Sequence, residues 1–328
     1  MRVTASRSVV RPLAIGLAIL LIAACTPTIG SGGPVVPRPT DGGTIAPATP
    51  EPTDGATAPP QTDAPPTGTP STPSPDPAGT PRATKTPSGA TAVRIYLFSG
   101  ETLVPVLRPI ERTRAVGRAA LEELLAGPTP AESAGPTRLT SAVPPGTLLL
   151  GLDIADGTAT VDLSREYESG GGSASMFGRL SQVVYTLTQF PTVERVAFRL
   201  DGRPVTVFSG EGIVLDGPST RADYTSFLPP VFVDSPAVGG LLANPGRLTG
   251  MANVYEAAFM VEIRDRNGNT LARQPAMATC GTGCWGTFDV TIRYEVNEQQ
   301  VGSLLVYTHS AQDGSVQDLR SYPVTLVP

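Results

Sequence analysis

The chain has 328 residues, with 24 Lys and Arg against 29 Asp and Glu. A slightly acidic chain with scattered arginines lacks the basic surface that binds a nucleic-acid backbone, so we expect no nucleic-acid partner. About half of its 35 prolines fall in one stretch that cannot build a hydrophobic core, so the folded part is shorter than the length suggests.

Residues 1–24 have the pattern of a lipoprotein signal peptide. Three early arginines precede an apolar run from Leu13 to Ala24, which is about half as long as a bilayer-spanning helix. The run ends in Ala23-Ala24-Cys25 and resembles the lipobox, in which a signal peptidase cleaves before a lipidated cysteine. The alternative is an ordinary signal peptide followed by a buried cysteine. We expect Cys25 to carry the lipid.

The predicted anchor sets the location of the protein. Two or more acyl chains attached at Cys25 would hold it stably in a membrane. Thr26 is not the acidic residue that retains lipoproteins at an inner membrane, so we expect the outer face of the cell membrane, with the rest extracytoplasmic. Residues 25–91 form the lipidated cysteine and a disordered Pro/Thr-rich linker, which would span about 50 Å on average and roughly 200 Å when fully extended.

Residues 92–216 alternate between strand and helix patterns. The pattern predicts a hairpin of Val93–Leu97 with Leu103–Leu107, a second hairpin around Asp156-Gly157, and helices from about Thr113 to Ala126 and from Ser173 to Phe190. A strand through residues 196–200 then returns at 205–208. We therefore predict an α+β domain whose helices cover one face of a sheet.

Four motifs in this region resemble the GerMN domain, which takes its name from a spore-germination protein. They are a tyrosine in the first strand, Leu-Leu-Ala-Gly-Pro at 124–128, Val-Pro-Pro-Gly at 143–146 and Ala-Thr-Val-Asp-Leu-Ser at 159–164. The resemblance implies an extracytoplasmic module of bacterial envelope lipoproteins, with no established active site. Asp162 could bind a cation together with Glu166 and Glu168, but Asp and Ser at a strand end more often hydrogen-bond nearby backbone.

Residues 229–328 contain seven short extended runs and no helical stripe. The runs are 231–233, 247–253, 257–265, 270–278, 286–294, 303–310 and 320–327. This spacing predicts an all-β sandwich. The segments Val-Asp-Ser-Pro at 233–236, Asn-Pro at 244–245, 250–257 and Trp-Gly-Thr-Phe at 285–288 resemble the immunoglobulin-like domain that accompanies GerMN. Asp265, Asn267 and Asn269 are interpreted as a turn, because a calcium loop would need a terminal glutamate.

Two features of the second domain are candidate sites. Cys280 and Cys284 are close enough to form a disulfide in an oxidising compartment. Trp285 could stack on a sugar ring, with Tyr255 and Glu256 assisting, although a tryptophan that begins a sandwich strand is more often part of the core.

The sequence offers no catalytic apparatus. His309 is the only histidine, and no phosphate loop or nucleophile elbow is present, so we predict no enzyme, no metal site and no cofactor. The first hypothesis is a lipid-anchored binding or adaptor module that meets an envelope protein or peptidoglycan. The alternative is a carbohydrate- or peptidoglycan-binding module, and a weaker one is a wall-modifying hydrolase with paired carboxylates. The pattern leaves open how the two domains pack across residues 217–230.

Overall fold

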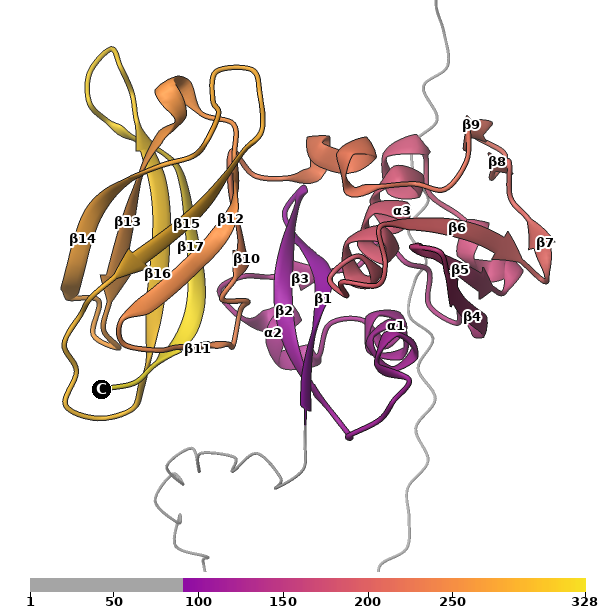
Figure 1. Ribbon diagram of the computed structural model, residues 1–328, viewed down its shortest axis with the longest axis horizontal. Helices are drawn as coiled ribbons and strands as arrows, with labels where there is room; N and C mark the ends of the chain where they lie inside the picture. The colour runs from indigo at the N-terminus through magenta and orange to yellow at the C-terminus, as the bar shows by residue number, and fades with distance from the viewer. Residues whose placement is uncertain (1–90) are drawn as a thin grey trace, which may run out of the picture. The chain divides into compact units, whose positions relative to one another are not determined.

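The computed structural model describes residues 91–328 (Figure 1). The predicted signal peptide, Cys25 and the linker up to residue 90 lie outside these residues. Within residues 91–328, no helix is both long and apolar enough to cross a membrane.

The first domain begins with a three-stranded antiparallel sheet in the order β2-β1-β3. Strands β1 (Thr91–Ser99) and β2 (Thr102–Ile110) form a hairpin, and the short β3 (Leu139–Thr140) pairs with the other edge of β1. Gly100 adopts the positive φ of 63° that the tight turn between the first two strands requires.

A second sheet has the order β4-β5-β6-β7. Its strands are β4 (Leu149–Ala155), β5 (Thr158–Leu163), β6 (Arg195–Leu200) and β7 (Arg203–Pro204). Asp156 and Gly157 have φ values of 48° and 74°, as the predicted tight turn of the β4–β5 hairpin requires. Strands β5 and β6 are parallel, joined through the 3-10 turn η1 (Arg165–Glu168) and helix α3 (Ser173–Leu187).

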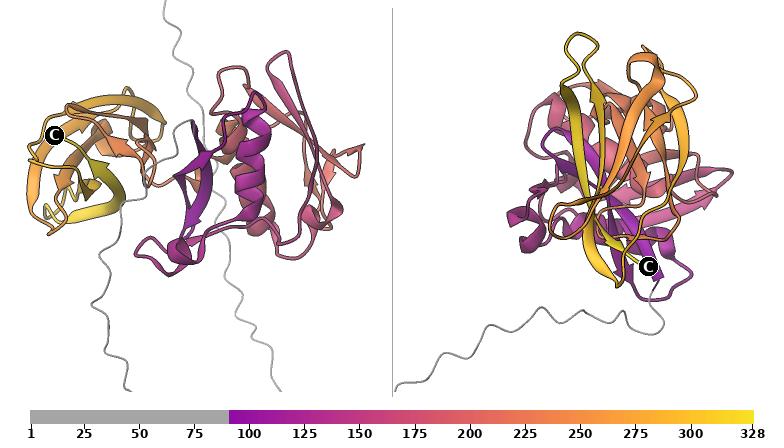
Figure 2. Two further views of the ribbon diagram at one scale, coloured as in Figure 1. Left: turned by 90° about the horizontal axis from the view of Figure 1, so that it is seen from below. Right: turned by 90° about the vertical axis from the view of Figure 1, so that its left-hand side faces the viewer.

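The helices lie between the two sheets, which Figure 2 shows in its left view. Helix α1 (Val116–Ala126) contacts β1 and β4, and α3 contacts β1 and β6. Every residue from 178 to 187 is buried, as expected of a helix covered on two sides. The prediction of an α+β domain with helices on one face of a sheet is confirmed. Local alternation does not specify which strands pair, so the division of these strands into two sheets is seen only in the structure.

Two smaller differences from the predicted elements follow from local geometry. Helix α1 begins at Val116 because the Thr113 hydroxyl accepts a hydrogen bond from the Ala115 amide at 3.0 Å, within a turn. The short helix α2 (Pro130–Ala134) follows it. The expected return strand at 205–208 is shorter than predicted. Only β8 (Val207–Phe208) is a strand there, and β8 pairs with β9 (Ile213–Val214).

The second domain is the predicted all-β sandwich. One sheet has the order β10-β12-β15 and the other β11-β17-β16-β13-β14. The first comprises β10 (Val231–Ser235), β12 (Gly246–Ala252) and β15 (Gly286–Ile292). The second comprises β11 (Leu241–Leu242), β13 (Ala258–Arg264), β14 (Thr270–Met277), β16 (Gln300–His309) and β17 (Val316–Leu326). Two 3-10 segments, η2 (Arg221–Phe227) before β10 and η3 (Tyr255–Ala257) before β13, complete the described chain.

Candidate functional site

A cluster of charged and aromatic side chains joins the two domains, and we call it the domain joint. At its centre is Asp234 of β10, which accepts a hydrogen bond from the Tyr96 hydroxyl of β1. Arg94 Nη1 lies 3.2 Å from Asp234 Oδ2, and Arg221 Nη1 of η2 lies 3.4 Å from Oδ1. Segments distant in sequence therefore converge on one carboxylate.

The Arg221 guanidinium packs against two tyrosine rings of the joint, whose centres are 5.4 Å apart. Its central carbon lies 4.7 Å from the ring centre of Tyr185 and 5.3 Å from that of Tyr96. Burial raises the pKa of Tyr185 to about 12, and burial with the nearby Asp234 raises that of Tyr96 further, so both rings stay neutral. Burial alone would lower the pKa of Arg221, but Tyr96 and Asp234 outweigh it and raise the value, so the guanidinium stays charged.

Main-chain pairing completes the joint. The Leu107 amide of β2 donates to the Val238 carbonyl at 3.0 Å, and the Val238 amide donates to the Pro105 carbonyl at 2.9 Å. A continuous set of buried apolar side chains also runs through both domains, including Ile95 of the first and Phe232 of the second. Backbone, apolar and charged contacts therefore all link the two domains.

A cavity of about 560 Å³ lies in the second domain, between η3, β13 and the turn that joins β16 to β17. We call it the η3 cavity. Its lining includes Tyr255, Glu256, Phe259, His309, Gln317 and Asp318, and it includes no Arg or Lys. The Tyr255 side chain is exposed by 66%, and both acidic residues are exposed as well.

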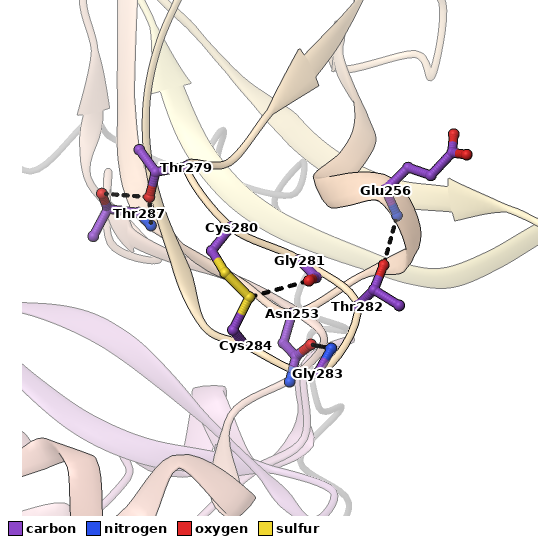
Figure 3. The surroundings of a disulfide bond; sticks show 9 residues. All are labelled: Asn253, Glu256, Thr279, Cys280, Gly281, Thr282, Gly283, Cys284 and Thr287. Atoms are coloured by element: carbon purple, nitrogen blue, oxygen red, sulfur yellow. Dashed lines mark hydrogen bonds between the residues drawn. A yellow bond between two sulfur atoms is a disulfide. The ribbon is translucent and has the colours of Figure 1, made fainter. Parts of the chain in front are cut away.

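The loop closed by the Cys280–Cys284 disulfide supports η3 (Figure 3). The Thr282 hydroxyl accepts a hydrogen bond from the Glu256 amide at 3.0 Å, while the Thr282 amide donates to the Val254 carbonyl at 2.9 Å. Glu256 has a φ of 52°, in the left-handed region that non-glycine residues rarely adopt. The disulfide-closed loop therefore bonds to the backbone at the point where its conformation is least favourable.

The structure brings together two of the three predicted ligand-binding residues. Tyr255 and Glu256 both line the η3 cavity. Trp285, which follows the disulfide loop, is half-buried against the hydrophobic core and is not among the residues that line the cavity. Sequence reasoning did not place His309 and Asp318 in the same site as Tyr255, because they come from a different part of the chain.

Comparisons with known proteins follow this division into two domains. A family model for the Germane domain, described as "Sporulation and spore germination", matches residues 94–206. A second, described as "Immunoglobulin-like domain of bacterial spore germination", matches residues 230–315. The chain carries a GerMN domain followed by a germination-type immunoglobulin-like domain. The resemblance predicted from the motifs is confirmed. No match was found among curated proteins.

Solved structures similar to the chain include three structures of two bacterial proteins. The first GerMN domain of the sporulation protein GerM from Bacillus subtilis is 25% identical, with a TM-score of 0.36, covering 40% of this chain and 99% of that one. The tandem GerMN domains of the same protein are 17% identical, with a TM-score of 0.38 and coverages of 73% and 61%. A putative lipoprotein from Clostridium perfringens is 20% identical, with a TM-score of 0.30 and coverages of 44% and 97%.

Other polar groups singled out by sequence are used within the chain. In the GerMN domain, Asp162 Oδ1 accepts from the Gly202 amide at 2.9 Å, and the Ser164 hydroxyl accepts from the Leu148 amide at 3.0 Å. In the immunoglobulin-like domain, Asp265 Oδ1 accepts from two amides of its own loop. Among residues 91–328, no three His, Cys, Asp or Glu side chains lie together as a metal site would need.

Glu262 of β13 is a buried carboxylate that sequence reasoning missed. Its side chain is only 1% exposed and accepts hydrogen bonds from Arg264 at 2.7 Å and Arg273 at 2.8 Å. Burial alone would raise the pKa of Glu262, but bonds from these two arginines, Thr270 and Tyr307 outweigh it and hold the pKa at about 2. The carboxylate is therefore ionised at neutral pH and stabilises the sheet.

Proposed function

We propose that this GerMN protein is a lipid-anchored, extracytoplasmic, non-catalytic adaptor on the outer face of the cell membrane. The domain joint carries the proposal. An adaptor must hold two surfaces in a defined orientation, and the contacts at Asp234 and Val238 link the two domains through both side chains and backbone. The signal and lipobox pattern ending at Cys25 supports the anchor.

Cell fractionation with a Cys25→Ser variant tests the anchor. The unaltered protein should sediment with membranes and incorporate labelled palmitate, and the variant should do neither. A Cys280→Ser variant is the matched control and should stay with the membrane, because its cysteine lies in the folded domain. Equal membrane retention of the Cys25→Ser variant would show that the protein is held at the membrane by something other than a lipid on Cys25.

A second experiment tests the adaptor function. The full chain and an Asp234→Ala variant are cross-linked in intact envelopes, and the cross-linked partners are identified by mass spectrometry. An adaptor should give a defined partner for each domain, and cross-links from one partner to the other should be strong only when the joint is intact, because the joint sets the orientation of the two domains. Identical complexes from both proteins would argue against the adaptor.

Peptidoglycan binding is the second candidate function, and the η3 cavity favours it. An exposed tyrosine above a partly apolar cavity is a common arrangement for holding a sugar ring. Glu256 and Asp318 line the same cavity, as the weaker hydrolase alternative requires. Glycan cleavage, however, needs one acid kept protonated by burial, and both carboxylates are exposed. We therefore favour binding over cleavage.

A further inference from the structure

We propose that the η3 cavity binds a neutral pyranose ring of a wall glycan on Tyr255, and that the Cys280–Cys284 loop holds this tyrosine in position. The inference deepens the peptidoglycan-binding candidate above by assigning it a site, a ligand class and a supporting segment. It does not depend on the membrane anchor.

The charge of the lining selects against anionic ligands. Glu256 and Asp318 are the acidic residues of the cavity, and no Arg or Lys accompanies them. A phosphate or carboxylate would meet two carboxylates there and no guanidinium or ammonium group. Carboxylates instead accept hydrogen bonds from hydroxyl groups, which a sugar supplies in number.

Neutral polar groups and apolar side chains share the rest of the lining. Gln317 and Ser310 can both donate and accept hydrogen bonds, and His309 has its Nδ1 3.0 Å from the Gly314 carbonyl, which makes Nε2 the acceptor of the neutral ring. Phe259 and Met260 supply apolar surface. A sugar ring, with an apolar face and a rim of hydroxyl groups, matches this mixture better than a simple cation does. A cation cannot accept hydrogen bonds from the donor groups of the lining.

The size of the cavity fits a small ligand or one segment of a polymer. Its volume of about 560 Å³ lies within the range of roughly 300–1,000 Å³ that is typical of small-molecule sites. Tyr255 is 66% exposed, so one face of its ring is open to a ligand. Figure 1 places η3 and the β16–β17 turn at the same end of the sandwich, where a glycan strand could pass without entering the core.

The disulfide loop determines where Tyr255 lies. The Glu256 amide, next to Tyr255, is bonded to the Thr282 hydroxyl, and the Gly283 amide is bonded to the Asn253 side chain at 2.9 Å (Figure 3). A side chain at Gly281 would collide with the backbone of Ala257, so the loop packs directly against η3. Opening the disulfide should release these contacts and weaken binding without removing any group that lines the cavity.

Calorimetric titration of the full-length chain in detergent with chitotriose tests the site. The unaltered protein should bind chitotriose, and Tyr255→Ala should weaken binding about tenfold, the effect of losing roughly 1.4 kcal/mol of stacking. Val301→Ala is the matched control, because Val301 is also 66% exposed but lies outside the cavity. Absence of binding by the unaltered protein, or equal affinity of the Tyr255→Ala variant, would overturn the proposal.

Two further variants test the loop. Thr282→Val removes the hydroxyl that accepts from Glu256 and should weaken chitotriose binding, whereas Thr282→Ser should restore it. Reduction of the disulfide in the unaltered protein should also weaken chitotriose binding. Fluorescence of Trp285, the only tryptophan, checks that each protein remains folded. Unchanged affinity in folded Thr282→Val and in folded reduced protein would overturn the role of the loop.

Two further results would point to a different function for the cavity. If the protein binds tetramethylammonium in preference to chitotriose, the ligand is a cation and the proposed sugar site is wrong. Release of shorter oligosaccharides during prolonged incubation would replace binding with cleavage. Neither outcome depends on the Cys25→Ser fractionation, so failure of the anchor and failure of the sugar site can be told apart.

Discussion

The domain joint and the η3 cavity both contain a tyrosine and acidic side chains, but these side chains are hydrogen-bonded differently in the two places. At the joint, Asp234 and Tyr96 are bonded to each other and to arginines. At the cavity, Tyr255 and Glu256 are exposed, and no side-chain hydrogen bond to another described residue is found for either. Polar side chains that are hydrogen-bonded within the chain stabilise the fold. Polar side chains that make no such hydrogen bond can form one with a ligand.

The largest expected effect is at the joint. Asp234→Ala leaves Arg94 and Arg221 without their carboxylate, so we expect a loss of about 3 kcal/mol in the free energy of unfolding. Urea unfolding can follow each domain separately, because Trp285 reports on the immunoglobulin-like domain and far-ultraviolet circular dichroism reports on the GerMN helices. The two probes should coincide in the unaltered protein and separate in the variant.

An exposed ion pair provides the control for this prediction. Arg247 and Asp289 are 2.7 Å apart but largely exposed, so Asp289→Ala should leave the unfolding midpoint nearly unchanged. A similar loss of unfolding free energy from both substitutions would mean that the ion pairs of the joint stabilise the protein no more than an exposed ion pair does.

The disulfide loop should give the second largest effect. Replacing both Cys280 and Cys284 by serine removes a five-residue closed loop, worth about 2 kcal/mol by chain entropy. Because the joint is intact in this variant, the destabilisation should shift Trp285 fluorescence and the circular dichroism of the GerMN helices together. A shift confined to Trp285 fluorescence would contradict the coupling of the two domains through the joint.

Glu262 sharpens the comparison because it resembles Asp234 but lies within one domain. Its folded-state pKa of about 2 is below the usual 4.5, so its stabilising contribution is present above pH 4.5 and is lost as the pH falls towards 2. We expect on the order of 1 kcal/mol, since Arg264 and Arg273 are 40% and 53% exposed. The stability difference between the unaltered protein and Glu262→Gln should therefore shrink in acid, and a constant difference would contradict the prediction.

The smallest effect is expected at the cavity. Tyr255→Ala should change the free energy of unfolding by no more than about 0.5 kcal/mol, because the side chain is mostly exposed. Thermal unfolding of this variant beside Val301→Ala measures the change. A large loss would mean that Tyr255 supports the fold and that its open position is not a ligand site.

Local pattern located most strands and the main helices of the described chain. Alternating apolar residues and the Asp156-Gly157 turn were sufficient for the β4–β5 hairpin, whose register follows from the turn. The pairing of β1 with the two-residue β3 had no local signal. The sequence therefore predicted most strands of both sheets but not every pairing between them.

The candidate sites show the same limit. Tyr255, Glu256 and the cysteines could be named from sequence because each pair is local in the chain. Asp234 followed a predicted strand, but nothing near it indicated that Arg94 and Tyr96 would be its partners. A partly buried ion pair between distant segments is a property of the packed domains, and no periodicity encodes it.

The backbone pairing at Val238 has a consequence for the GerMN domain by itself. Strand β2 forms the edge of its sheet, and Val238 covers the backbone groups of Pro105 and Leu107. An uncovered edge strand is a template for adding strands from other molecules, and Val106 next to these groups is almost fully buried. We therefore expect the excised GerMN domain to aggregate, as measured by light scattering, at concentrations where the two-domain chain does not.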